Sequence, residues 1–307
     1  MVCFQAIPIL TNLSILQLLN VFMFLIAGAT LQTILRKSWT FLEKGTFDNS
    51  YQVPLRVKSI AHNGKPHIDE YNKFIVTARN PLERMISWFF FVHPKNRREL
   101  SYNKNGDVIF QCYDELDDLV SEGLSLRFPS EEKDKLCQEV AREVIKGSCR
   151  GKNVSGSFMQ MNNNYKFYLE DLFKKDEEKK KEIYVVRTEE FDHDLRSINE
   201  LLGGKSIVEY RVFTHRGLNQ TPPVSNKKIK LRGKNNACFF LCPEIQLYKK
   251  LLHRAVNLSQ EDVKKSLDKL SETCPREAKN DFCNGKSYPI NQREKCMENI
   301  KMLNEYF

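Results

Sequence analysis

Residues 73–91, KFIVTARNPLERMISWFFF, join a short apolar strand pattern to a clearly marked helix start. The first six residues are typical of a buried strand because they are mostly apolar and end at a polar break. Asn80 is a favoured N-cap residue, Pro81 suits the first helical position, and Glu83 has the capping-box spacing. The segment therefore predicts a strand over 73–78 that leads directly into a helix.

The same alternation of strand and helix occurs elsewhere in the chain. Further strand patterns occupy residues 21–26 and 182–186. The helical patterns that follow the three strands cover residues 31–41, 81–91 and 191–202. Short apolar strands that alternate with helices predict a parallel sheet in an α/β fold.

The C-terminal part is expected to be helical up to Cys274. Residues 245–255 and 263–270 carry apolar stripes at helical spacing, and Ser259 with Asp262 resembles a capping box. The residues after Cys274 are expected to form a loop-rich tail. The predicted organisation is an apolar leader or anchor over 1–20, one domain over 21–275, and a tail over 276–307.

Composition and charge narrow the class of protein. The 307 residues are 41% hydrophobic and 28% charged, which excludes disordered, collagenous and fully membrane-embedded chains. The net charge of +9 suits an anionic ligand or an acidic surface. Residues 1–35 contain no Lys, Arg, Asp or Glu, and Arg36 and Lys37 follow them. This segment is long enough to span a bilayer, so a membrane anchor and a buried strand and helix both remain open.

The cysteines favour an oxidising compartment. The chain has 9 Cys, and all but Cys3 lie in the folded part. No CxxC pair occurs, so a zinc site is not indicated and some disulfides are expected, with their pairing open. Glycosylation sequons at Asn153, Asn219 and Asn257 are compatible with a secretory location.

The start of the helix at residue 81 is the best candidate for a ligand site. Arg79 follows the strand, and at 100° per residue Asn80, Arg84 and Ser87 share one helix face. A guanidinium beside a helix N-terminus at the carboxyl end of a strand favours phosphate. The alternative is a well-capped helix whose arginines pair with surface carboxylates.

Residues 79–87, RNPLERMIS, resemble the Arg-(Asp/Asn)-Pro-x-x-Arg-x-x-Ser motif of sulfotransferases that use 3′-phosphoadenosine 5′-phosphosulfate (PAPS). The resemblance is closest to the Golgi carbohydrate sulfotransferases. It implies a P-loop-like three-layer fold, with a central parallel sheet flanked by helices and a helical C-terminal cap. It also implies sulfuryl transfer from PAPS to a carbohydrate hydroxyl, in a single-pass membrane protein of the Golgi or another secretory membrane with a luminal catalytic domain.

The resemblance assigns roles to particular residues. Arg79 and Ser87 match the residues that hold the nucleotide 3′-phosphate. The stretch VRTEE, which contains Arg187, and the later NELLG resemble a second conserved strand and helix of the family. The stretch HRGLN, which ends at Asn219, is similar to the loop that closes over the nucleotide. Arg187 and Asn219 are therefore expected to contribute to cofactor binding.

The family's 5′-phosphosulfate loop has only one counterpart in this sequence, Gly28, Ala29 and Thr30. Its usual Lys is missing, because the first 35 residues contain no cation. This departure puts turnover in doubt, so a catalytically inactive sulfotransferase-like protein that binds nucleotide or glycan remains the alternative. The same residues compete with the membrane-helix interpretation, and we favour strand, loop and helix.

A base is required to deprotonate the acceptor, and the resemblance points to a His or Glu upstream of Arg79. His62 is the first choice, with His67 and Glu70 as alternatives. No metal is expected to take part.

Other functions fit less well. Asp192 and Asp194 have the Asp-x-Asp spacing of a glycosyltransferase, but a carboxylate at a helix start explains them better. The phosphate-loop motif of nucleotide kinases is absent. The basic run over 227–234 lacks interleaved aromatic residues, so an anionic cofactor or glycan suits it better than nucleic acid.

Overall fold

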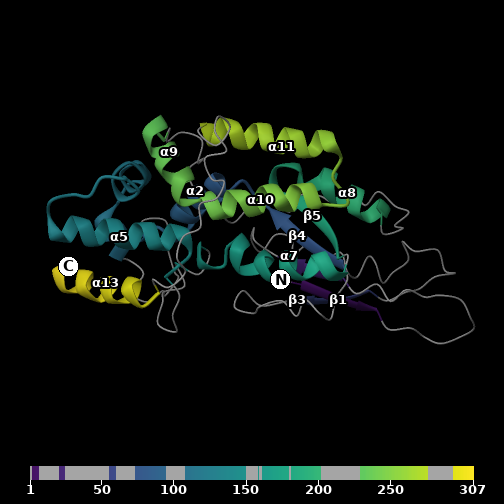
Figure 1. Ribbon diagram of the computed structural model, residues 1–307, viewed down its shortest axis with the longest axis horizontal. Helices are drawn as coiled ribbons and strands as arrows, with labels where there is room; N and C mark the ends of the chain where they lie inside the picture. Colours follow the sequence, from purple (N-terminus) through teal and green to yellow (C-terminus); the bar gives the residue numbers. More distant parts are fainter. Residues whose placement is uncertain are drawn as a thin grey trace, which may run out of the picture. The chain divides into compact units, whose positions relative to one another are not determined.

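The computed structural model describes ten parts of the chain. These are residues 2–6, 21–24, 55–59, 73–94, 108–149, 158, 161–179, 181–201, 229–275 and 293–307. The expected helix over 31–41 lies outside them. The described chain is mostly helical and contains a small sheet (Figure 1). This confirms the coarser part of the prediction, an α/β character.

The sheet contains β1 (Val2–Ala6), β2 (Val21–Phe24), β3 (Leu55–Ser59), β4 (Lys73–Ala78) and β5 (Glu182–Arg187), in the order β1-β3-β2-β4-β5. Strands β4 and β5 pair in parallel over their full length, from Lys73 opposite Glu182 to Ala78 opposite Arg187. Strand β2 runs parallel to β4, and β1 runs antiparallel to its neighbours. The predicted strands at 73–78 and 182–186 and their parallel pairing are therefore confirmed.

Strands β4 and β5, which lie at one end of this order, are almost completely buried. From the second residue onward, every side chain of both strands is buried. Continuous apolar runs of this kind are expected where a parallel sheet is covered on both faces. Asn257 fixes β5 further, because its side chain accepts from the Val185 amide at 2.7 Å and donates to the Val185 carbonyl at 2.9 Å.

Helices make up most of the remaining described chain. In chain order they are α2 (Pro81–Val92), α3 (Val108–Cys112), α4 (Leu116–Asp118), the π-turn η4 (Leu119–Gly123), α5 (Glu132–Lys146), α7 (Tyr165–Lys179), the 3₁₀ turn η5 (Thr188–Glu190), α8 (Phe191–Leu201), α9 (Leu231–Phe240), α10 (Cys242–Arg254), α11 (Gln260–Thr273) and α13 (Arg293–Tyr306). Helices α2, α8, α10 and α11 confirm the helical patterns of the sequence.

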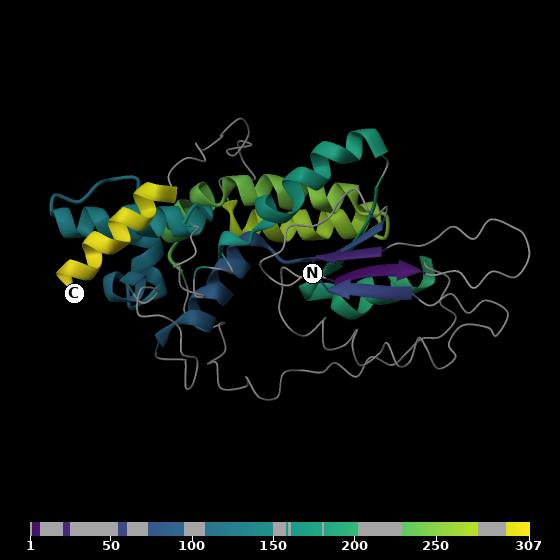
Figure 2. The ribbon, with the colours of Figure 1, turned by 90° about the horizontal axis from the view of Figure 1, so that it is seen from below.

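The tail prediction is wrong at residues 293–306, which form α13 instead of a loop. This helix buries Cys296, Ile300 and Leu303, which follow one another at helical spacing. It lies beside α5 in both views (Figures 1 and 2), where Asn299 donates to Glu139 at 2.9 Å. A disulfide between Cys149 and Cys296 adds a covalent link.

The chain divides into two compact units. Unit 1 comprises Met1–Arg79, Phe167–Leu218 and Lys249–Lys264, and unit 2 comprises Asn80–Lys166, Asn219–Tyr248 and Lys265–Phe307. Unit 1 contains the sheet. Unit 2 contains the three disulfides between described cysteines, Cys112–Cys137, Cys149–Cys296 and Cys238–Cys274.

These bonds confirm the expectation of disulfides, and Cys242 is disulfide-bonded as well. Among the described residues, no helix has the length and apolar character needed to cross a bilayer.

Candidate functional site

The site predicted at residues 79–87 begins in unit 1, at the end of β4. Residues Phe74 to Ala78 are buried, and Arg79, which follows them, is half-buried. Because β4 and β5 are parallel, Arg79 comes directly after the carboxyl end of the strand pair. That edge of a parallel sheet is where α/β proteins bind ligands.

In unit 2, the start of α2 has the cap that the sequence predicts. The Asn80 side chain accepts from the Leu82 amide at 3.0 Å, and Pro81 occupies the first turn. The Asn80 side-chain amide also donates to Thr273 at 2.9 Å, so the side chain is held at both ends. Glu83 pairs with Lys269 at 3.2 Å instead of closing a capping box. The cap is thus formed by the side chain of Asn80.

Arg84 departs from the prediction of a polar strip shared with Asn80 and Ser87. Its side chain is 7% exposed, and its Nη2 donates to Glu244 Oε2 at 3.1 Å. Glu244 also accepts from the Tyr165 amide at 2.9 Å and the Lys166 amide at 3.2 Å, which caps the start of α7. Arg84 therefore balances a buried carboxylate that organises three helices of the chain. Ser87 is half-buried on the same helix as Arg84.

Arg187 lies in unit 1 at the end of β5, and its side chain is fully buried. Its Nε and Nη2 donate to the two carboxylate oxygens of Asp194, at 2.9 and 2.7 Å. Its Nη1 donates to the Asp262 carbonyl at 3.0 Å, and its Nη2 also reaches the Asp262 carboxylate at 2.9 Å. The guanidinium thus has a structural role in place of the cofactor-binding role that the resemblance implies.

The electrostatics of this network follow from burial and hydrogen bonding. Burial lowers the pKa of Arg187, but the bonds with Asp194 and Asp262 outweigh it and raise the pKa. Burial raises the pKa of Asp194, and the two-point contact with Arg187 offsets this effect only in part.

Asp262 is the more exposed carboxylate of the network. It forms the predicted capping box, since Ser259 Oγ accepts from the Asp262 amide and the Ser259 amide donates to the Asp262 carboxylate, both at 3.1 Å. Burial raises the pKa of Asp262, but the bonds from Ser259 and Arg187 outweigh it and lower the pKa to about 2. The carboxylate is therefore ionised throughout the ordinary pH range.

Several predicted site residues cannot be placed. Those outside the described residues are Gly28, Ala29, Thr30, His62, His67, Glu70 and Asn219. The described part of the predicted site therefore consists of Arg79 and Ser87, with Arg187 committed to its carboxylate partners.

Two other sequence interpretations are limited by the geometry. Asp194 is buried against Arg187, so the Asp-x-Asp spacing does not present two free carboxylates to a metal. Within the described parts of the chain, no group of His, Cys, Asp or Glu side chains could hold a metal ion.

Asn257 is buried and donates to β5, so its amide is not accessible for glycosylation in the folded protein. Asn153 and Asn219 lie outside the described residues.

No family model, curated protein or solved structure matches this chain.

Sequence reasoning missed the partners of Arg84 and Arg187. Glu244 is 160 residues from Arg84, and no local pattern could have indicated that contact. Asp194 is only seven residues from Arg187, and its position in the first turn of α8 was a usable signal. A strand that ends in Arg and leads into a helix with an early Asp can close such a pair locally.

Proposed function

We propose that the chain is a PAPS-dependent sulfotransferase that transfers a sulfuryl group to a hydroxyl of a carbohydrate. The observation that carries this proposal is the motif RNPLERMIS at the junction of a buried parallel strand and a helix capped by Asn80. Parallel pairing of β4 with β5 supports the finer proposal of a P-loop-like three-layer fold. In such a fold, anions bind where strands end and helices begin.

The proposed roles follow the motif. Arg79 would hold the 3′-phosphate by charge-assisted hydrogen bonds, and Ser87 would donate one more. Gly28, Ala29 and Thr30 would surround the 5′-phosphate, and Asn219 would lie on the loop that closes over the nucleotide. Arg187 would support the site indirectly, by fixing the end of β5 and the start of α8.

The proposed reaction is an in-line displacement at sulfur. The acceptor oxygen forms a new bond to sulfur, while the bond from sulfur to the 5′-phosphate oxygen breaks and 3′-phosphoadenosine 5′-phosphate (PAP) leaves. The acceptor proton passes to a base, for which His62 is the candidate. The disulfides support a luminal location, because such bonds persist in oxidising compartments. We propose anchoring in a secretory membrane through the apolar N-terminal segment.

The experiment is a transfer assay with radiolabelled PAPS and a panel of glycan acceptors, using the full chain. Activity should fall at least tenfold in Ser87→Ala, since a hydrogen bond to a charged group contributes about 1.5–3 kcal/mol. Arg196→Ala is a matched control because Arg196 is exposed on α8 and outside the motif.

The missing Lys of the 5′-phosphate loop favours a second candidate, a protein that binds nucleotide or glycan without turnover. PAP binding without transfer to any acceptor would support that candidate over the enzyme. Transfer that is equally fast in the wild-type protein and Ser87→Ala would contradict the proposed site.

A further inference from the structure

A cavity of about 490 Å³ opens in unit 2, beside the segment that joins η4 to α5. Its lining comes from that segment, from η4, α3, α5 and α9, and from Tyr113 and Phe307. The volume falls within the range of small-molecule sites, about 300–1,000 Å³. None of the residues predicted for the nucleotide site lines this cavity.

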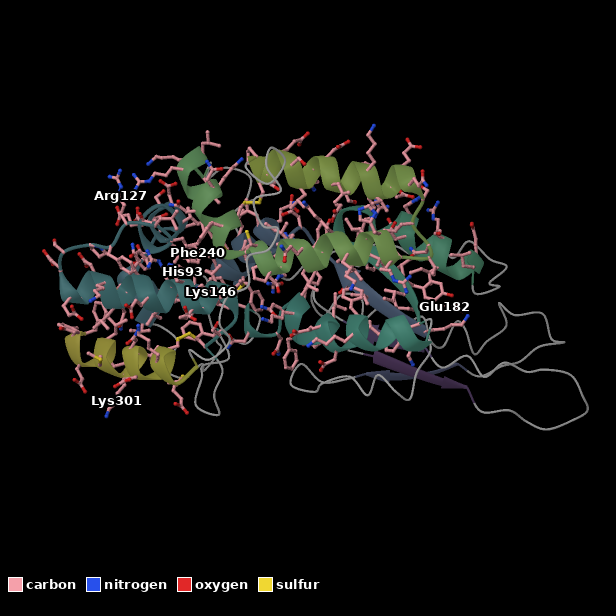
Figure 3. The ribbon with its side chains drawn as sticks, in the orientation of Figure 1. His93, Arg127, Lys146, Glu182, Phe240 and Lys301 are labelled. Atoms are coloured by element: carbon pink, nitrogen blue, oxygen red, sulfur yellow. A yellow bond between two sulfur atoms is a disulfide. The ribbon has the colours of Figure 1, made fainter. Side chains whose placement is uncertain are left out.

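Three cations line the cavity: Arg127, Lys133 and Arg232. Arg127 (labelled in Figure 3) and Arg232 are exposed, and neither forms an ion pair within the part of the chain that the structure describes. Arg232 belongs to the basic run over 227–234. The three cations outnumber the two carboxylate side chains of the lining, Glu122 and Asp134, so the side chains of the cavity favour a ligand with a negative group.

An aromatic face is held in place at the same cavity. Phe128 is 61% exposed, yet the Arg142 guanidinium lies 4.4 Å from its ring centroid. Arg142 is itself buried, and it donates to the carbonyl of Ser125 in the same segment. The covered face fixes the ring by a cation–π contact, while the rest of the ring stays open to stack against a flat apolar surface.

Gln138 is one of the residues that line the cavity, and it keeps one buried acceptor unsatisfied. Gln138 is 3% exposed, and its Nε2 donates to the carbonyls of Glu122 and Arg127, both at 2.8 Å. Its Oε1 is buried and has no hydrogen-bond partner within the described residues. A buried acceptor without a partner costs about 1–3 kcal/mol, so a ligand that donates a hydrogen bond to this oxygen would recover that cost.

We propose that this cavity binds an acidic saccharide, a sugar ring that carries a carboxylate or sulfate group. Arg127 and Arg232 take the anionic group, Phe128 stacks on the apolar face of the ring, and a sugar hydroxyl donates to Gln138. A peptide of acidic residues supplies the charge, but it has no ring with an apolar face that could stack on Phe128 and with hydroxyl donors around its edge. The site stands independently of sulfuryl transfer, since none of its residues belongs to the proposed nucleotide site.

The test is calorimetric titration of the full chain with an unsulfated chondroitin hexasaccharide. The carboxyl-reduced form of the same hexasaccharide is the neutral matched ligand, and hexaglutamate is the acidic peptide ligand. The double variant Arg127→Ala/Arg232→Ala and the single variant Phe128→Ala remove the anion contact and the stacking face. Lys301→Ala is the control, because Lys301 is an exposed cation of α13 outside the cavity lining (Figure 3).

The proposal expects the chondroitin hexasaccharide to bind at least tenfold more tightly than its carboxyl-reduced form or hexaglutamate. It expects the double variant and Phe128→Ala each to weaken binding at least tenfold, and Lys301→Ala to leave binding unchanged. The proposal is overturned if the wild-type protein does not bind the chondroitin hexasaccharide, or if the double variant binds it as tightly as the wild-type protein. It is also overturned if hexaglutamate binds more tightly than the hexasaccharide. A PAP titration separates the two proposals. If the wild-type protein binds the saccharide but not PAP, the proposed function is contradicted and the saccharide site is supported.

Discussion

The two units of the chain both bury an arginine–carboxylate pair, but they hold the surrounding structure together by different means. In unit 2, the Arg84–Glu244 pair lies in a region with three disulfides between described cysteines. In unit 1, the Arg187–Asp194 pair closes the end of a parallel strand pair through hydrogen bonds alone. Covalent closure stabilises mainly by restricting the unfolded chain, whereas a buried ion pair depends on native geometry. The stability of unit 2 should therefore respond to reductant, and that of unit 1 to pH and to substitution of single carboxylates.

The largest expected effect comes from the disulfide that closes the longest loop among those between described cysteines. Cys149 and Cys296 are separated by 147 residues, and a loop of that length corresponds to about 5 kcal/mol of unfolding free energy. We expect Cys149→Ser/Cys296→Ser to lower the free energy of unfolding by about that amount. The matched control is Cys112→Ser/Cys137→Ser, whose separation of 25 residues corresponds to about 3.5 kcal/mol. Hydrogen exchange should increase first in α5 and α13, and equal losses in the two variants would contradict the loop-length argument.

Removal of the charge of Asp194 should have the next largest effect on the free energy of unfolding. In Asp194→Asn the fully buried Arg187 keeps its charge and loses its two-point partner. Breaking a buried ion pair from one side costs about 3–5 kcal/mol, which urea unfolding would measure. The control is Asp192→Asn on the same helix, since Asp192 forms no ion pair within the described residues. Similar losses in both variants would show that the network does not hold β5.

Glu244→Gln is the corresponding change in unit 2, and its effect should be smaller. The Gln oxygen can still accept from the start of α7, so mainly the charge that balances Arg84 is lost. We expect a loss of about 2–3 kcal/mol in the free energy of unfolding. Oxidised and reduced protein should be compared. If Glu244→Gln lowers the free energy of unfolding more than Asp194→Asn does, the disulfides do not reduce the effect of losing the ion pair in unit 2.

The smallest effect is the pH dependence that Asp262 gives to unit 1. The folded pKa of about 2 lies below the ordinary value of 3.8, so the stabilisation is fully present above about pH 5 and is lost as pH falls toward 2. We expect the free energy of unfolding of the wild-type protein to exceed that of Asp262→Asn by roughly 1–2 kcal/mol at neutral pH. Urea unfolding between pH 6 and 2 should show this difference shrinking as the acid range is entered. A difference that stays constant with pH would mean that the charge of Asp262 contributes nothing.

Local signals in the sequence were sufficient for much of the described fold. Apolar runs found β4 and β5, and Asn80 with Pro81 marked the start of α2 correctly. Periodicity found α10 and α11, but α13 was missed although Cys296, Ile300 and Leu303 have helical spacing. That error came from treating a charged terminal segment as loop without counting its apolar positions.

The site was harder to predict because its arginines have partners elsewhere in the chain. A helical projection places Arg84 with Asn80 and Ser87 on one face. It does not contain Glu244, and the hydrogen bond to Glu244 determines the orientation of the Arg84 side chain. The family motif could not distinguish a ligand-binding Arg187 from a buried structural one, since both require a guanidinium at the end of a strand. Arg79 and Ser87 remain the described residues on which the nucleotide prediction rests.

Calorimetric titration of PAP into the full chain tests the central claim most directly. The wild-type protein and the control Arg196→Ala should bind PAP equally. Arg79→Ala should weaken binding by a hundredfold or more, because the variant loses charge-assisted hydrogen bonds that together contribute about 3 kcal/mol. The three proteins should have the same circular dichroism spectrum. Absent binding by the wild-type protein, or undiminished binding by a folded Arg79→Ala, would contradict the assignment of residues 79–87 as a nucleotide site.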